Sequence, residues 1–155
     1  MRAKSNRAPI TRGTTEMTGE ETANFSWPVR VYWEDTDGGG VVYHSRYLNF
    51  FERARSELLR AKGIHQKELK EKHGFVWVVT EMNVKFRQAA KLDDELSVSA
   101  DYRGSRGVRQ GFHQVITRQG DDEVIATAEV TAVMLHADTM KPARMPGWIK
   151  QKLEQ

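Results

Sequence analysis

The sequence predicts an α+β fold in which one long helix packs against an antiparallel sheet of five strands. One segment has the apolar spacing of an amphipathic helix, and the segments before and after it alternate or run apolar as strands do. Short turns join the later strands, which favours antiparallel pairing. One helix of about four turns cannot cover both faces of such a sheet. The sheet therefore either wraps around the helix or buries its far side against another subunit.

The first predicted element is a strand from Val29 to Trp33, because its side chains alternate and Pro28 suits the first position of a strand. The glycines Gly38–Gly40 then break any regular element and allow positive φ angles. The short apolar group Val41–Tyr43 leads into the helix.

The long helix is predicted to begin with Ser45 as its N-cap and to end at Gly63 in a C′ position. Its apolar positions follow the i, i+3, i+4, i+7 rule. They are Tyr47, Phe50, Phe51, Ala54, Leu58 and Ala61. A second, more polar helical segment from His65 to Lys72 is expected to close at Gly74.

The rest of the chain predicts strands. The apolar run Phe75–Val79 continues into alternation up to Phe86. Further strands are expected over residues 96–102, 108–118 and 124–135, with a turn at residues 120–122 before the last. Even positions of the last strand line one face, while Val133 and Leu135 indicate that its other face is also partly covered. A short helix is expected over Trp148–Leu153.

Length and composition describe one domain after a polar tail. The chain has 155 residues, of which 39% are hydrophobic and 29% charged, as in ordinary globular domains. Residues 1–26 are polar and aperiodic, which predicts a disordered or loosely attached tail, and residues 27–155 form the predicted domain. The chain has no cysteine, which excludes a thiolate nucleophile and cysteine-ligated zinc.

The charge and hydropathy patterns bear on partners and location. The net charge of +3 would suit an anionic ligand, an acidic protein or a membrane surface, although plain solubility explains it more simply. No apolar run is long enough to span a bilayer, and residues 1–12 lack the apolar core of a secretory signal. We therefore expect a cytoplasmic protein. No nucleic-acid motif accompanies the basic residues.

The strongest candidate for chemistry is Asp37, a carboxylate beside three glycines and just before a helix. Glycines let the backbone approach a ligand closely, and a helix start offers unpaired N–H groups and a positive dipole end. A substrate carbonyl held there could be attacked by Asp37 or by a water that Asp37 activates. The structural alternative is that Asp35 and Asp37 merely stabilise an Asx turn. Spacing alone leaves both open and slightly favours the second.

Other polar residues are more ambiguous. His44 could hydrogen-bond a carbonyl or a leaving group, although a lone histidine is more often structural. Glu52 is followed by Arg55 and Ser56, which predicts a salt bridge on the helix surface. The arginines between residues 103 and 109 could hold a phosphate or form a solvated hairpin. The spacing of the histidines predicts no metal site, and neither a serine-hydrolase elbow nor a nucleotide-binding glycine loop is present.

Residues 29–55, VRVYWEDTDGGGVVYHSRYLNFFERAR, closely resemble the Tol–Pal-associated acyl-CoA thioesterases of the 4-hydroxybenzoyl-CoA thioesterase group. The resemblance extends over about residues 27–153 and includes Lys91–Asp94 and Met140–Arg144. It implies a hotdog fold, in which an antiparallel sheet wraps a central helix. It also implies hydrolysis of acyl-CoA to free acid and CoA, without a cofactor, since CoA is part of the substrate.

The resemblance also implies roles for individual residues. The family's catalytic aspartate falls on Asp37 and its histidine on His44, and the oxyanion donors are expected as the backbone N–H groups of Tyr43 and His44. Binding of substrate is carried over more loosely to a few further residues. These are Gly40 in the loop, Val79 and Thr80 from a partner subunit, and Arg103 and Arg106 near the CoA phosphates. A third glycine, Gly38, stands where the family varies and removes no catalytic group.

The family forms dimers that join sheets edge to edge, and tetramers are common, so a homodimer or homotetramer is expected. Acyl carrier protein is a further type of partner, and peripheral contact with the inner membrane is compatible with the resemblance. The sequence does not choose an acyl chain length, nor between Asp37 as nucleophile and as general base. A non-catalytic scaffold that binds acyl carrier protein or cell-envelope machinery is the second hypothesis, and a hotdog dehydratase ranks last.

Overall fold

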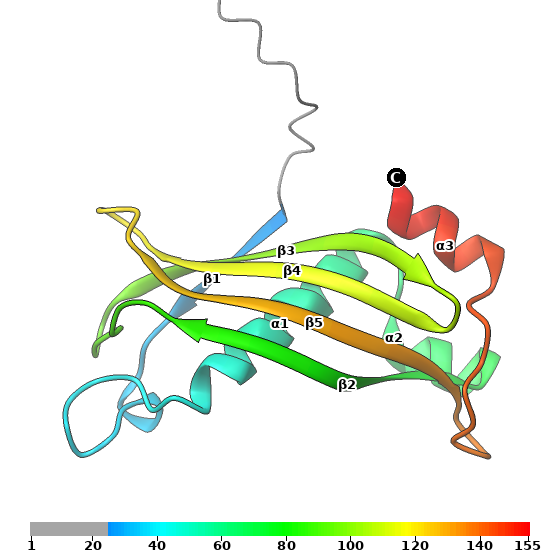
Figure 1. Ribbon diagram of the computed structural model, residues 1–155, viewed down its shortest axis with the longest axis horizontal. Coiled ribbons are helices and arrows are strands. Elements are labelled where there is room, and N and C mark those ends of the chain that lie inside the picture. The colour runs from blue at the N-terminus through cyan, green and yellow to red at the C-terminus, as the bar shows by residue number, and fades with distance from the viewer. Residues whose placement is uncertain (1–24) are drawn as a thin grey trace, which may run out of the picture.

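The computed structural model describes residues 25–155, in which a five-stranded sheet covers one long helix (Figure 1). The predicted tail, residues 1–26, falls mostly outside the described residues. The elements follow the predicted order. They are β1 (Phe25–Arg30), the 3-10 helix η1 (Trp33–Asp35), α1 (Arg46–Ala61), α2 (Gln66–Glu68), the π-helical turn η2 (Leu69–His73), β2 (Phe75–Phe86), β3 (Glu95–Arg106), β4 (Arg109–Arg118), β5 (Val124–His136) and α3 (Gly147–Glu154).

Every pair of neighbouring strands is antiparallel, and the strand order is β1-β3-β4-β5-β2. This confirms the predicted sheet. The chain crosses from β1 over α1 to the far edge at β2, and the hairpins β3–β4 and β4–β5 fill the middle. β2 pairs with β5 from Phe75 to Phe86, and a bulge at Thr80 shifts the register by one residue between Val79 and Glu81.

Helix α1 buries one face against the sheet, as its spacing predicts. The buried residues of α1 are Tyr47, Phe50, Phe51, Ala54, Leu58 and Leu59. Leu59, outside the predicted set, is buried too, and Ala61 of that set is exposed. Gly63 follows the helix with φ +75°, a left-handed conformation that favours glycine. Ser45 is the N-cap residue, as predicted, but its side chain makes no capping hydrogen bond.

The first strand lies earlier than predicted. It already includes Phe25 and ends at Arg30 rather than Trp33. The chain then turns into η1, where the Asp35 N–H donates to the Tyr32 carbonyl at 3.0 Å. Alternation alone could not place this end, because the tight turn depends on the burial of Asp35 rather than on the apolar pattern.

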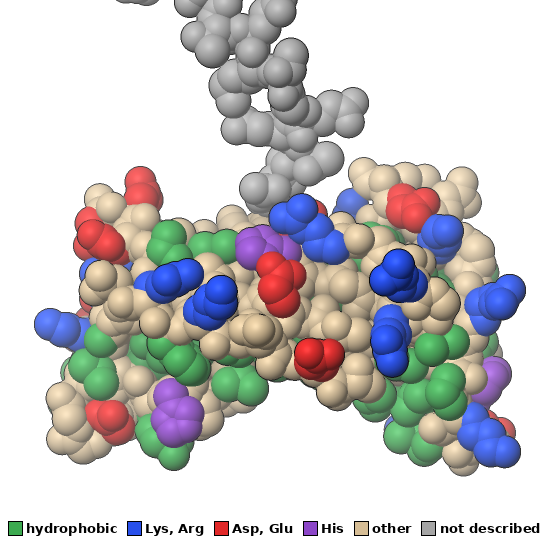
Figure 2. All heavy atoms as spheres, viewed as in Figure 1, with side chains coloured by type: hydrophobic (Ala, Val, Ile, Leu, Met, Phe, Trp, Pro, Cys, Tyr) green, Lys and Arg blue, Asp and Glu red, His purple; other side chains and the backbone are tan. Residues whose placement is uncertain are grey.

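The core lies between α1 and the inner face of the sheet, and a second apolar cluster packs α3 and η2 against the end of the sheet that is farther from η1. In β5, Val133 and Leu135 are buried together with the even positions 126–134, as predicted, whereas Val124 at the start of that face is 39% exposed. The opposite face of the sheet carries acidic and basic side chains scattered among polar ones (Figure 2). Among the described residues, no helix is long and apolar enough to cross a membrane.

Candidate active site

The predicted catalytic acid lies in an exposed loop between η1 and α1, which we call the aspartate loop (residues 36–43; Figure 1). The Asp37 N–H donates to the Val41 carbonyl at 2.8 Å and closes the loop. Carboxylate Oδ1 of Asp37 accepts the Gly39 N–H at 2.7 Å and the Val41 N–H at 3.4 Å. Within residues 25–155, Oδ2 has no hydrogen-bond partner. The Asx turn of the structural alternative is therefore formed, and one oxygen of the same carboxylate stays open to a ligand.

Asp35, only two residues earlier, is buried and fully hydrogen-bonded, in contrast to the exposed Asp37. It is 1% exposed, and its Oδ1 accepts both Nε and Nη2 of Arg46 at 3.0 and 2.9 Å. Its Oδ2 accepts the Tyr32 N–H at 2.9 Å. Asp35 thus fastens the start of the aspartate loop to the first turn of α1. Spacing alone did not separate the two acids, whereas burial does, since Asp35 is buried and Asp37 is exposed.

Two of the three glycines have a steric reason in this loop. Gly40 has φ +82°, where a side chain would be strained. A Cβ on Gly39 would lie 3.2 Å from Oδ1 of Asp37 and would push on that carboxylate. Gly38 has open space around it and no positive φ, so this position has no steric need for glycine. The structure thus gives Gly40 a conformational role in shaping the loop, and leaves its predicted role in substrate binding untested.

The predicted oxyanion donors differ in availability. The Tyr43 N–H donates to the Asp35 carbonyl at 2.8 Å, so it is already engaged. The His44 N–H has no partner within the described part of the chain. The imidazole of His44 is exposed and lies against the Tyr43 ring, with ring centroids 4.5 Å apart. Only the His44 N–H remains as a predicted donor open to a substrate in this chain.

A second loop, residues 87–94, lies beside the aspartate loop, and we call it the bracing loop. The Val42 N–H donates to the Ala90 carbonyl at 2.8 Å, and the Ala90 N–H donates to the Tyr47 hydroxyl at 3.1 Å. Burial raises the pKa of Tyr47 above its ordinary value, and the bond from Ala90 partly opposes that rise. Tyr47 was predicted only as a core residue of the helix, so its hydroxyl contact is a feature that periodicity missed.

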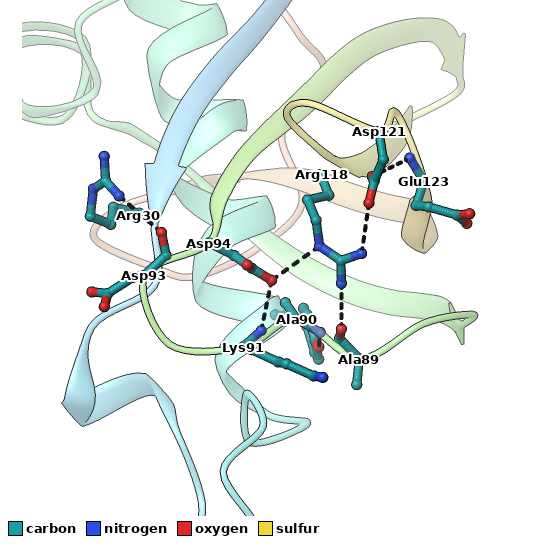
Figure 3. Close-up of polar contacts among 10 residues, drawn as sticks. Arg30, Ala89, Ala90, Lys91, Asp93, Asp94, Arg118, Asp121 and Glu123 are labelled. Atoms are coloured by element: carbon teal, nitrogen blue, oxygen red, sulfur yellow. Dashed lines mark hydrogen bonds and ion pairs between the residues drawn. The ribbon is translucent and has the colours of Figure 1, made fainter.

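Arg118 of β4 holds the bracing loop in place (Figure 3). Its Nε donates to Asp94 Oδ2 at 3.1 Å, and its Nη2 donates to the Ala89 carbonyl at 2.7 Å. Asp94 also accepts the Lys91 N–H at 2.9 Å. A hydrogen bond from Arg118 to Asp121 is the largest contribution to an Arg118 pKa above its ordinary value. Support for the candidate site therefore reaches from α1 through the bracing loop to β4.

The predicted partner residues Val79 and Thr80 lie in the middle of β2, well away from Asp37 of the same chain. Val79 is 44% exposed on the outer edge of the sheet. Thr80 is the bulge residue, and its hydroxyl donates to the Thr131 carbonyl at a long 3.4 Å. One chain therefore does not bring these residues to the aspartate loop.

The predicted phosphate-binding arginines lie still farther from Asp37, at the β3–β4 hairpin at the opposite end of the sheet (Figure 1). Arg103, Arg106 and Arg109 border a hollow of about 340 Å³. Arg103 is paired with Asp101 at 3.0 Å. The ladder sets Arg109 beside Val133 and Val133 beside Val78, so the arginines share the half of the sheet that carries Val79.

The predicted surface salt bridge between Glu52 and Arg55 is not formed. Arg55 instead turns inward, where its Nη1 donates to the Gln114 Oε1 at 2.8 Å, and Glu52 accepts the Ser56 hydroxyl at 3.1 Å. The i+3 spacing allowed the pair, but the buried amide of Gln114 competes for the guanidinium. In residues 25–155, no group of three or more His, Asp or Glu side chains could hold a metal ion.

Most of the chain is similar in sequence to known proteins. Residues 31–153 match the family described as the thioesterase-like superfamily. The chain is 42% identical over 126 residues to an acyl-CoA thioesterase YbgC of Haemophilus influenzae, covering 81% of this chain and 91% of the relative. It is 40% identical over 134 residues to an acyl-CoA thioester hydrolase YbgC of Escherichia coli, covering 86% and 98%.

Solved structures agree on the fold. A probable thioesterase from Bartonella henselae is 36% identical with a TM-score of 0.68, covering 79% of this chain and 98% of that one. A 1,4-dihydroxy-2-naphthoyl-CoA thioesterase from Synechocystis reaches a TM-score of 0.79 at 21% identity, covering 85% and 96%. The predicted hotdog fold and the resemblance drawn from residues 29–55 are both confirmed. The chain belongs to the thioesterase-like superfamily.

Proposed function

We propose that this protein hydrolyses the thioester bond of acyl-CoA, releasing a free acid and CoA. The relatives that match most of its length carry the names of acyl-CoA thioester hydrolases. Within the site, we assign the catalytic role to the carboxylate of Asp37. It is exposed, its Oδ1 is oriented by loop N–H groups, and its Oδ2 is open within the described chain.

Asp37 can drive the reaction by two routes. As a general base it takes a proton from water while the water oxygen adds to the thioester carbon, and the C–S bond then breaks. The thiolate of CoA leaves and takes up the proton. As a nucleophile Asp37 adds to the same carbon and expels the thiolate, and water then cleaves the resulting anhydride. The nucleophilic route needs the open Oδ2 beside the carbonyl carbon, and the general-base route needs it within hydrogen-bonding distance of the attacking water.

The negative charge that develops on the carbonyl oxygen needs a donor at the start of α1. The His44 N–H is suited to this, because it is unpaired within the described chain and lies at the positive end of the helix dipole. The Tyr43 N–H would have to leave the Asp35 carbonyl first. The His44 side chain, exposed beside this N–H, would position the carbonyl or the water.

A second copy of the chain would complete the site. β2 is an edge strand of twelve residues, and a long open edge is a template for another strand. Two-fold antiparallel pairing of β2 with its copy brings the start of one strand to the end of the other. Phe86 at the end of β2 contacts Tyr47 at the start of α1, with ring centroids 5.6 Å apart. The partner's aspartate loop would therefore come close to the half of β2 that contains Val79.

The same pairing would bring the arginines of the β3–β4 hairpin toward the partner's site. Arg109 is level with Val78 in the ladder, so the β3–β4 hairpin would lie at the end of the sheet that receives the partner's aspartate loop. Arg103 and Arg106 would then face the phosphates of CoA, which arginine binds well. A tetramer, a cytoplasmic location, contact with the inner membrane, a Tol–Pal association and acyl carrier protein as partner stay predictions from the resemblance.

The test is release of free thiol from a panel of acyl-CoA thioesters of increasing length. We expect turnover by the wild type, and a loss of about 10²–10⁴-fold in kcat/KM for Asp37→Asn with an unchanged melting temperature. Asp93→Asn is the matched control, because its carboxylate is exposed near the same end of the molecule and should not affect turnover. Wild-type turnover by Asp37→Asn would remove the mechanism. No thiol release across the panel would favour the non-catalytic scaffold.

A further inference from the structure

A pocket of about 130 Å³ lies beneath the edge strand β2, between it and α1. Its apolar wall comes from both the helix and the sheet and consists of Leu59, Trp77, Val78, Val79, Phe112 and Ala132. Its polar wall is built by α1 and the start of α2 and consists of Glu52, Arg55, Ser56 and Gln66. The pocket thus combines an apolar surface with hydrogen-bonding groups, as ligand pockets do.

Arg55 is the unusual member of this pocket. Its guanidinium donates once, to Gln114, and no carboxylate lies within ion-pair distance in the described chain. Burial lowers the pKa of Arg55, and the charge of Glu52 only partly opposes this. A guanidinium carries five N–H donors, so most of its hydrogen-bonding capacity is unused here.

Arg55 is also held in a fixed position. Gln114 is fully buried, and its Nε2 donates to the Phe51 carbonyl at 3.0 Å and the Ser99 carbonyl at 3.2 Å. Its Oε1 is therefore aimed at Arg55 by contacts to both α1 and the sheet. Glu52, the nearby acid, is exposed and bound to Ser56. The pocket consequently presents a pre-positioned donor with unused N–H groups.

We propose that this pocket receives the far end of the acyl group and that Arg55 selects acyl groups carrying an oxygen acceptor there. The inference rests on the proposed function and its dimer, because two-fold pairing brings the partner's aspartate loop to the Val79 half of β2. Arg55 lies about 15 Å along α1 from Ser45, too far for a short acyl group attached at the same chain's Asp37. The volume corresponds to about four water molecules, so the group is short.

Arg55→Met tests the selection, with Arg53→Met, an exposed neighbour on the same helix, as the matched control. The substrates are pentanoyl-CoA, glutaryl-CoA with a terminal carboxylate, and 5-hydroxypentanoyl-CoA with a neutral hydroxyl. We expect Arg55→Met to lower the preference for an oxygenated substrate over pentanoyl-CoA by about tenfold or more in kcat/KM. The two oxygenated substrates distinguish a charged from a neutral acceptor. An unchanged preference for both would overturn the proposal.

A merely structural Arg55 would behave differently, since its loss would lower turnover of all three substrates equally along with the melting temperature. A variant that changes oligomeric state in gel filtration would likewise assign Arg55 to the subunit contact and overturn the proposal. Binding of free glutarate and of 5-hydroxypentanoate to the Asp37→Asn protein gives a readout without turnover. A further outcome is that the wild type hydrolyses no thioester while either free acid still binds and Arg55→Met abolishes that binding. That result would support the pocket as a binding site and contradict the proposed reaction.

Discussion

The aspartate loop and the bracing loop lie side by side, yet their polar groups are used in opposite ways. In the bracing loop, Asp94 is bonded to the Arg118 side chain and to the Lys91 N–H, and Arg118 in turn binds the Ala89 carbonyl (Figure 3). In the aspartate loop, Asp37 meets only N–H groups of its own loop. One loop has its acid tied to another element, and the other leaves its acid exposed.

In this site, the residues that stabilise the loops differ from the residue proposed to react. Paired groups such as Asp94 and Arg118 hold a loop in one conformation but have little left for a ligand. An open carboxylate contributes little to folding and is free to react. The two loops are joined at Val42 and Ala90, so the paired loop positions the open one.

The largest expected effect on the free energy of unfolding comes from Asp35, the acid that anchors the aspartate loop. Asp35→Ala removes a buried carboxylate and leaves Arg46 and the Tyr32 N–H without their acceptor. Breaking a buried pair costs about 3–5 kcal/mol, and the partial exposure of Arg46, 26% for its side chain, reduces this to about 2–4 kcal/mol. Urea unfolding measures it. A loss no larger than that of Asp37→Ala would break the contrast between the two acids.

A smaller loss is expected from the bracing loop. Asp94→Ala removes two hydrogen bonds, one of them to a charged arginine, and should lower the free energy of unfolding by about 2 kcal/mol. Because the loop supports Val42, turnover should also fall a fewfold, with a larger change in kcat than in KM. Denaturant unfolding and thiol release measure the two effects. Full turnover in a clearly destabilised Asp94→Ala protein would show that the bracing loop does not position its neighbour.

A single contact between α1 and the bracing loop gives a still smaller effect. Tyr47→Phe keeps the ring, which is 4% exposed, but leaves the Ala90 N–H without its acceptor. We expect a loss of about 1 kcal/mol, seen as a shift in the urea midpoint with an unchanged slope. Tyr43→Phe is the control, since that side chain is exposed, and it should leave the midpoint in place.

The smallest expected effect is a change in how the free energy of unfolding depends on pH in the acid range. The pKa of Asp121 lies below its ordinary value, chiefly because the carboxylate accepts the Glu123 N–H and also binds Arg118. A lowered folded-state pKa adds stability above the ordinary carboxyl value, and this is lost as the pH falls through the lowered value. Asp121→Asn should therefore lose slightly more stability at about pH 7 than at about pH 3 in urea titrations. An equal loss at both values would remove Asp121 from the network.

Local pattern determined much of this molecule. The 3.6-residue spacing of α1, the glycine that ends it, the period-2 strands and the turn at residues 120–122 are all properties of neighbouring residues. The order of elements and the antiparallel sheet follow from them, and the run of residues 29–55 was specific enough to identify the family. The position of Asp37 beside the glycines and the helix start was likewise visible in the sequence.

The tertiary structure alone decided which polar groups are paired. Asp35 became the buried acid through Arg46, eleven residues on. Arg55 turned from Glu52 to Gln114, 59 residues away, and the first strand ended early because η1 had to bury Asp35. Periodicity reports which face of an element is apolar, but the partner of a polar group depends on which distant residue the fold brings within about 3 Å. That information is carried by the packing of the whole chain.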